Sequence, residues 1–99
     1  MRVLLLTKEL RKQFPKLYAT EGIPTEEKKV IAKFFTPDSN WTFYAVEFDQ
    51  DDTFFGLVDG FEREWGYFSL KELQGIRGKF GLPVERDRHF GQPKIKDIK

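Results

Sequence analysis

The sequence predicts a single α+β domain, in which four antiparallel strands form a meander sheet between an N-terminal helix and a short helix after the last strand. The chain of 99 residues has room for one hydrophobic core. Its centre is rich in aromatic and β-branched residues, in segments separated by clusters of turn-forming residues. Connections of about three to five residues leave no room for crossover helices, so neighbouring strands should run antiparallel.

The N-terminal helix is predicted from the spacing of Leu10, Phe14 and Leu17, which places them on one helical face. Thr7 is a suitable N-cap, because its hydroxyl can accept a hydrogen bond from a free backbone N–H of the first turn. Pro15 lacks an N–H, and its ring crowds the carbonyl one turn earlier. The helix should therefore break or kink just before this proline.

The strands are predicted from apolar runs that end at dense turn signals, such as residues 36–40 and 49–53. The four expected strands cover residues 30–35, 41–48, 54–61 and 64–68.

The second helix should begin at Ser69, because Ser69 and Glu72 have the spacing of a capping box. Phe68 and Leu73 flank this cap as a hydrophobic staple would. Residues 92–99 are charged and are expected to form a frayed tail.

If Phe48 opposes Phe54 and the alternation is uninterrupted, both faces of the sheet are substantially apolar. One face would carry Trp41, Phe43, Ala45, Glu47, Phe55, Leu57, Asp59 and Phe61. The other would carry Thr42, Tyr44, Val46, Phe48, Phe54, Gly56, Val58 and Gly60. Either the two helices and the tail cover both faces, or part of one face stays exposed and binds a second copy or another protein.

The composition limits the compartment and the chemistry. The absence of cysteine excludes disulfides, thiolate metal sites and a cysteine nucleophile, and it favours the cytoplasm. The apolar run at residues 3–6 is too short for a signal peptide or a membrane span, so no membrane association is expected.

The charge is unevenly distributed along the chain. Residues 38–64 contain eight acidic residues and one basic residue, a net charge of −7, between basic ends of +4 each. The acidic middle segment and the basic ends either form two surfaces for different partners or attract each other within one fold.

Four acidic residues form a candidate cluster: Glu47, Asp59, Glu62 and Glu64. Paired carboxylates can act as acid and base or hold a divalent cation. The alternative is that these four carboxylates are simply hydrated, with Glu47 and Asp59 at the solvent-exposed edge of the sheet. The aspartates at 49, 51 and 52 do not form a calcium loop, because the required glycine and glutamate positions hold Phe54 and Gly60.

Arg86, Arg88 and the single histidine, His89, form a candidate anion contact, with a salt-linked loop edge as the alternative. One histidine cannot build the usual zinc site, and no glycine-rich phosphate motif is present, so no cofactor is expected. The basic C-terminal quarter favours nucleic acid, but the acidic block would repel a phosphate backbone.

The candidate binding residues are the tryptophans and tyrosines of the strands, because these side chains dominate binding hot spots. They are Trp41, Tyr44, Trp65 and Tyr67. The alternative is that most of them belong to the core.

Several motifs spread over nearly the whole chain give it a family resemblance. They are KFFTP (33–37), WTFYA (41–45), FGLVDGFE (55–62), EWGYFSL (64–70) with EL at 72–73, and GLP (81–83) followed by ERD (85–87). Together they resemble domain-of-unknown-function family 2958, small bacterial and phage proteins often carried on mobile elements. The resemblance implies a free-standing domain in a phage or mobile-element setting, without an assigned activity or catalytic residue.

The expected function is that of a small non-enzymatic protein that docks onto another protein, such as a host defence or replication factor, or forms a homodimer. The alternatives are a nucleic-acid-associated accessory factor and a carboxylate-based metal-binding enzyme.

Overall fold

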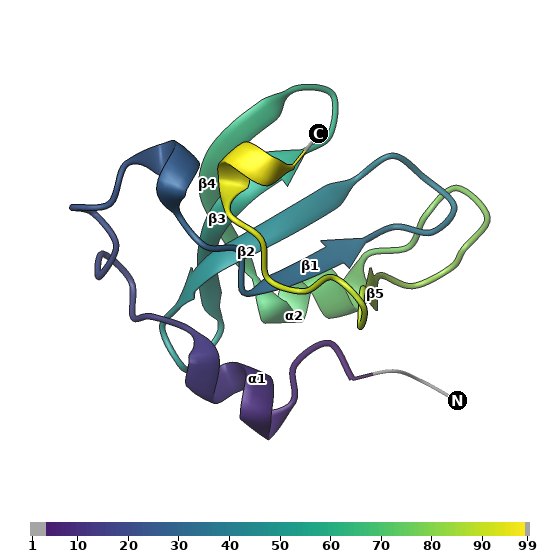
Figure 1. Ribbon diagram of the computed structural model, residues 1–99. Coiled ribbons are helices and arrows are strands. Elements are labelled where there is room, and N and C mark those ends of the chain that lie inside the picture. Colours follow the sequence, from purple (N-terminus) through teal and green to yellow (C-terminus); the bar gives the residue numbers. More distant parts are fainter. Residues whose placement is uncertain (1–3, 99) are drawn as a thin grey trace.

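The computed structural model describes residues 4–98, in which a five-stranded antiparallel sheet is flanked by short helices (Figure 1). The strands are β1 (Ala32–Phe35), β2 (Thr42–Phe48), β3 (Thr53–Asp59), β4 (Arg63–Ser69) and β5 (Glu85–Arg86), in the spatial order β4-β3-β2-β1-β5. The helices are α1 (Lys8–Gln13) and α2 (Leu70–Gly75), with 3₁₀ turns η1 (Thr25–Glu27) and η2 (Ile95–Asp97). No helix within the described range is long and apolar enough to cross a membrane.

The predicted meander of β1 to β4 is confirmed, but the expected number of four strands is wrong. β5 adds a fifth strand by pairing with the free edge of β1, where Phe34 lies opposite Arg86. A strand of two residues has no alternation that a sequence pattern could reveal.

Both predicted helix starts are confirmed. The Thr7 hydroxyl accepts a hydrogen bond from the Leu10 N–H at 3.1 Å, and α1 ends at Gln13, as expected from Pro15. Leu17 therefore lies beyond the helix.

The Ser69 hydroxyl caps α2 by accepting from the Glu72 N–H at 3.1 Å. The reciprocal bond of a capping box is not formed in the described part of the chain. Asp52 supports this helix start instead, accepting from the Lys71 N–H at 2.9 Å and from the Ser69 hydroxyl. Because Asp52 comes from the turn before β3, no local pattern could show this role.

The predicted division of the sheet into two faces is wrong for the first half of β2. Phe48 does lie opposite Phe54, but the register shifts between Ala45 and Glu47, which leaves Val46 as the extra residue of a β-bulge. A bulge reverses the alternation beyond it. The helix-facing side therefore holds Trp41, Phe43, Ala45, Phe48, Phe54 and Val58, and the opposite side holds Tyr44, Glu47, Phe55 and Leu57.

Gly56 allows the close approach of β2 and β3 beside this bulge. A Cβ at that position would lie 1.9 Å from the Tyr44 carbonyl oxygen. Only glycine avoids this overlap without moving the backbone.

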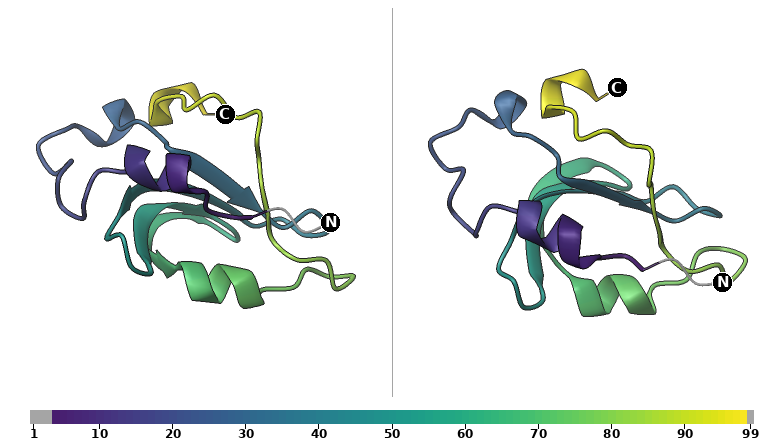
Figure 2. Two further views of the ribbon diagram at one scale, coloured as in Figure 1. Left: turned by 90° about the horizontal axis from the view of Figure 1, so that it is seen from below. Right: turned by 60° about the horizontal axis from the view of Figure 1, so that its bottom comes forward.

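The larger core lies between the sheet and the two α-helices, which Figure 2 shows on the same side of the sheet. It is built mainly from phenylalanine rings. The buried ones are Phe14, Phe34, Phe43, Phe48, Phe54 and Phe68. Phe48 and Phe54 stack with their ring centroids 4.4 Å apart. Leu10 of α1 and Leu73 of α2 complete this core.

The opposite side carries a smaller core of Val30, Tyr44 and Leu57, beneath η1 and η2 (Figure 2). In place of the frayed tail expected over 92–99, residues 93–98 pack on this face, and residue 99 lies outside the described range. The Val30 N–H donates to the Pro93 carbonyl, and the Ile95 N–H donates to the Lys28 carbonyl, both at 2.9 Å.

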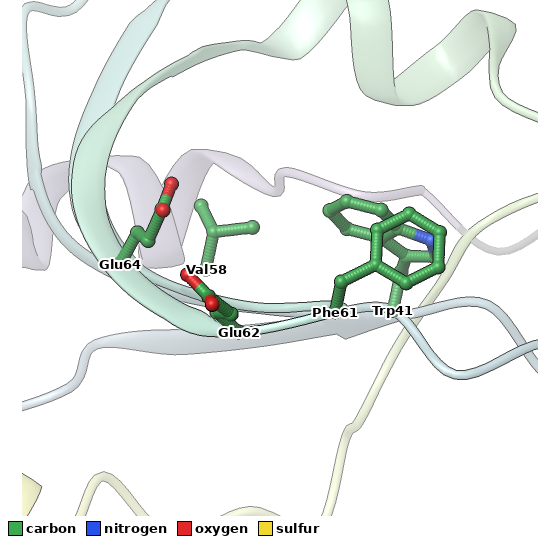
Figure 3. A pocket seen from close by; sticks show the side chains of 5 residues that line it. All are labelled: Trp41, Val58, Phe61, Glu62 and Glu64. Atoms are coloured by element: carbon green, nitrogen blue, oxygen red, sulfur yellow. The ribbon is translucent and has the colours of Figure 1, made fainter.

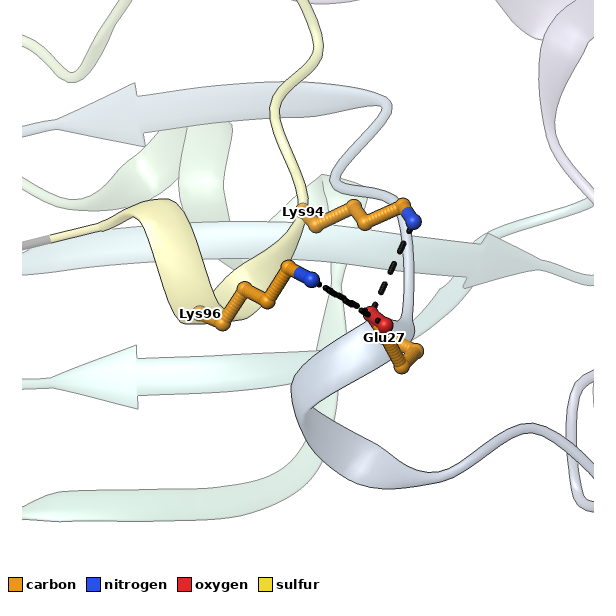
Figure 4. A network of polar contacts seen from close by, with 3 residues as sticks. All are labelled: Glu27, Lys94 and Lys96. Atoms are coloured by element: carbon orange, nitrogen blue, oxygen red, sulfur yellow. Dashed lines mark hydrogen bonds and ion pairs between the residues drawn. The ribbon is translucent and has the colours of Figure 1, made fainter.

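An ion-pair network joins η1 to η2. The Glu27 carboxylate contacts the ammonium groups of Lys94 at 3.6 Å and Lys96 at 3.1 Å (Figure 4). The hydrogen bond from Lys96 is the main reason why the pKa of Glu27 lies below its usual range.

Glu47 is buried, so its expected place at the wet rim of the sheet is wrong. The loop after α1 covers its side chain, which is only 3% exposed. The carboxylate accepts hydrogen bonds from the Tyr18 N–H at 2.8 Å, the Thr20 N–H at 3.0 Å and the Thr20 hydroxyl. The buried Lys28 ammonium in turn donates to the Thr20 hydroxyl oxygen at 2.9 Å. The hydrogen bonds of Glu47 thus hold the loop after α1 against the sheet.

Candidate functional site

Two aromatic rings meet at the end of the sheet where β2 begins and β3 ends. Trp41 is fixed by Thr36: the Trp41 N–H donates to the Thr36 hydroxyl at 3.1 Å, and the Thr36 N–H donates to the Trp41 carbonyl at 3.0 Å. Phe61 lies in the turn between β3 and β4. Its ring stands edge-on to Trp41, with centroids 5.5 Å apart and an interplanar angle of 80°.

The turn keeps Phe61 in solvent, where its side chain is 95% exposed. The Gly60 N–H donates to the Glu62 carbonyl at 3.1 Å and closes the turn. A Cβ on Gly60 would lie 2.4 Å from the Trp41 ring, so this glycine leaves the space that the indole occupies. The prediction that the third strand continues to Phe61 is wrong, because that strand ends at Asp59.

The two rings form one wall of an open pocket of about 240 Å³. Val58, Glu62 and Glu64 also line it; in Figure 3, Glu64 lies on the other side of Val58 from the rings, and Glu62 lies beside Val58. Neither carboxylate has a hydrogen-bond or ion-pair partner within residues 4–98. The pocket therefore combines apolar aromatic area with two uncompensated negative charges.

A positively charged side chain matches this combination. A cation near an aromatic ring is attracted by the ring's quadrupole. A guanidinium can at the same time make paired hydrogen bonds to a carboxylate. The arrangement is suited to holding an arginine or lysine that a partner supplies.

The structure does not bring the four predicted acidic residues together. Glu62 and Glu64 share the pocket, whereas the Asp59 carboxylate pairs with Arg63 at 3.1 Å, and Glu47 is buried on the opposite side of the sheet. Across residues 4–98, no three histidine, aspartate or glutamate side chains are grouped so as to hold a metal ion.

Tyr44 is not a surface contact, since it is only 7% exposed. Its place in the smaller core follows from the bulge, and burial raises the pKa of its hydroxyl.

Trp65 and Tyr67 lie away from the pocket, on the opposite side of the sheet, where Phe55 contacts both rings. Tyr67 is 55% exposed. A hydrogen bond with the Tyr18 hydroxyl is the main reason that the pKa of Tyr67 lies above its usual range.

Sequence reasoning missed Phe61 and Val58 as pocket residues. A signal for Phe61 was present, because a large apolar residue stands between Gly60 and Glu62, where a turn should be polar. Val58 carried no signal that would separate it from other strand residues.

The structure also does not bring all three residues of the predicted anion contact into one site. The Arg86 Nε donates to the Leu4 carbonyl at 3.1 Å, and Arg86 and Arg88 line a second cavity. His89 is exposed and does not line it; its backbone N–H donates to the Asp87 carboxylate at 2.9 Å.

The family described as "Protein of unknown function (DUF2958)" matches residues 5–95. No curated protein and no solved structure matches the chain.

Proposed function

The chain belongs to the DUF2958 family of proteins of unknown function, and we propose that it is a non-enzymatic binding protein whose aromatic–acidic pocket takes a basic side chain of a protein partner. The observation that carries the proposal is the exposed Phe61 ring, held against Trp41 beside two carboxylates that have no partner among residues 4–98. A contiguous apolar patch rimmed by polar residues is typical of a binding surface, and Phe61 forms such a patch together with Trp41.

Arginine is the partner residue that fits best. Its planar guanidinium can stack on an aromatic ring while its N–H groups bond to Glu62 or Glu64. A pocket of about 240 Å³ has room for such a side chain as an anchor. Buried anchors of this kind dominate binding energy in protein interfaces, with the surrounding surface adding complementarity.

The charge of the surrounding chain supports a basic protein partner. The pocket lies within residues 38–64, which carry a net charge of −7. Such a field speeds the approach of a positively charged surface and disfavours acidic competitors. It would also oppose a nucleic-acid backbone at this surface.

The cellular setting and the class of partner in this proposal come from the family resemblance. The protein acts in the cytoplasm of a bacterium that carries a phage or mobile element, and its partner is a host protein of defence or replication.

Affinity capture with a matched pair of variants tests this proposal. Phe61→Ala removes the exposed wall of the pocket, and Phe80→Ala removes another phenylalanine that is 79% exposed but does not line it. Wild type and Phe80→Ala should retain the same stoichiometric partner from the host lysate, and Phe61→Ala should lose it. A partner that Phe61→Ala retains equally well would show that the pocket is not the docking site.

A peptide elution step tests the chemistry. A short arginine-containing peptide should release the captured partner, whereas its citrulline counterpart, which is neutral and nearly isosteric, should not. Equal release by both peptides would contradict recognition of a cation.

A further inference from the structure

A second cavity, independent of the aromatic–acidic pocket, lies between α1 and the C-terminal segment. Its volume is about 170 Å³. Three of its lining residues are apolar and buried: Leu10, Ile31 and Ala32. Phe90 and Gln92 also line it, so the lining combines apolar side chains with polar ones.

The charged residues lining this cavity leave a positive excess. Arg86 and Arg88 both line it, and Asp87 is the acidic residue between them. The Asp87 carboxylate is already engaged, because it lies 3.8 Å from the Lys33 ammonium and accepts from the His89 N–H at 2.9 Å. Because Asp87 also faces the Lys33 ammonium, its single negative charge offsets the two arginines only in part.

Both arginines have N–H groups that donate no hydrogen bond to any of residues 4–98. Within residues 4–98, Arg88 has no hydrogen-bond or ion-pair partner, and Arg86 uses only its Nε, toward the Leu4 carbonyl. A guanidinium offers five N–H donors in a planar fork that matches a carboxylate or phosphate.

The wall beside the arginines has an unusual backbone. Gly91 and Gln92 are consecutive residues with positive φ angles of +79° and +54°. Gln92 is held in this conformation by its side-chain amide, which donates to the Ile31 carbonyl at 3.3 Å and to the Gln13 side chain. A positive φ is unstrained for glycine but costs energy for glutamine, and strained, well-anchored residues such as Gln92 are concentrated at ligand sites.

We propose that this cavity binds a small organic anion, whose carboxylate is held by Arg86 and Arg88 and whose apolar body lies on Leu10, Ile31 and Ala32. The charge selects an anion, and the apolar lining selects one with a hydrophobic body. An inorganic ion would satisfy the arginines alone and leave the apolar surface uncovered.

Two sources share this chemistry: a free small acid and the terminal carboxylate of a peptide with an apolar last residue. Benzoate serves as the probe for the first, and N-acetylphenylalanine for the second. Benzamide is the neutral counterpart of benzoate, and inorganic phosphate is the anion without an apolar body.

The test is a titration of the ¹⁵N-labelled full chain followed by two-dimensional NMR. Benzoate should shift the amide signals of Ala32, Phe90 and Gln92 in a saturable way, with a Kd on the order of millimolar for so small a ligand. Benzamide and phosphate should bind much more weakly. Tighter binding of N-acetylphenylalanine than of benzoate would assign the site to chain termini, and the reverse order would assign it to free acids.

Charge variants show whether Arg88 holds the anion. Arg88→Ala should weaken benzoate binding about tenfold or more, because it removes charge-assisted hydrogen bonds. Arg88→Lys should keep part of the affinity. Lys79→Ala, which removes the same charge from an exposed residue that does not line the cavity, should leave the affinity unchanged.

Three results would overturn the proposal: no saturable shifts with benzoate, equal affinity for benzamide, or unchanged affinity in Arg88→Ala. Arg88 is exposed, so its replacement should leave the fold intact, and the spectrum of the unliganded variant verifies this.

Discussion

Glu47→Gln should destabilise the domain strongly, although the two side chains have nearly the same size. The carboxylate accepts three hydrogen bonds, one from Tyr18 and two from Thr20, and is almost fully buried. The amide of glutamine has only one oxygen, so at least one of these donors would face an NH₂ group. Loss of the buried partner of an N–H costs about 1–3 kcal/mol.

The expected total is about 2–4 kcal/mol, because the remaining hydrogen bonds also lose the strengthening that a charged acceptor gives. This is a large part of the roughly 5–15 kcal/mol that stabilises a typical domain. For a chain of this length it corresponds to a fall in Tm of about 8 °C or more.

Urea denaturation followed by tryptophan fluorescence measures the change, with Glu21→Gln as the matched control on an exposed glutamate of the same loop. The control should stay within about 0.5 kcal/mol of wild type. A loss below about 1 kcal/mol in Glu47→Gln would show that the loop is held mainly by other contacts. The reasoning would then fail.

Three further predictions concern a glycine, a turn and the ion-pair network. Gly60→Ala should displace the Trp41 ring, because the new Cβ would lie 2.4 Å from it, and should change the chemical shift of the indole N–H. Burial acts to raise the pKa of Asp49, but hydrogen bonds from the backbone N–H groups of residues 51–53 outweigh it and hold the pKa below 3.8. Asp49→Asn should therefore cost stability above that pH, and its difference from wild type should shrink as the pH falls through the folded-state pKa. Glu27→Gln should speed amide hydrogen exchange in residues 94–98 at low salt but not near 1 M salt, where charges are screened beyond about 3 Å.

Each of these predictions has a control of the same kind. Gly66→Ala adds a Cβ that meets nothing within 4 Å, so it should leave the indole signal in place. Asp51→Asn changes a neighbouring carboxylate and should not reproduce the pH dependence of Asp49→Asn. Glu26→Gln alters an exposed acid of the same turn and should not affect exchange in residues 94–98. A control that behaves like its variant would refute the corresponding assignment.

Local patterns in the sequence predicted the elements that depend on local chemistry. Thr7 and Ser69 were found as helix caps because an N-cap needs only a hydroxyl and a nearby amide. The meander followed from short turns between aromatic runs, since such turns permit only antiparallel neighbours. The pairing of Phe48 with Phe54 followed from the same turn.

The features that the sequence did not predict depend on contacts between distant residues. A bulge at Val46 reverses the faces of β2, and its only signal is Gly56 on the neighbouring strand. Glu47 is buried because a loop 27 residues earlier in the chain folds over it. Of the five residues that line the pocket, the sequence singled out Trp41 as a binding residue and the two glutamates as part of an acidic cluster, without placing them together. Phe61 was not singled out, because its strand was expected to continue through it, whereas the strand ends at Asp59.

The most direct test of the central claim is an NMR titration of the full chain with an arginine-containing peptide and its citrulline counterpart, following the two indole N–H signals. The arginine peptide should shift the Trp41 signal and leave that of Trp65, on the opposite side of the sheet, unchanged. The shift should vanish in a variant that combines Glu62→Gln and Glu64→Gln. An equal response to citrulline, or a response confined to Trp65, would contradict the claim that this pocket binds a cationic side chain.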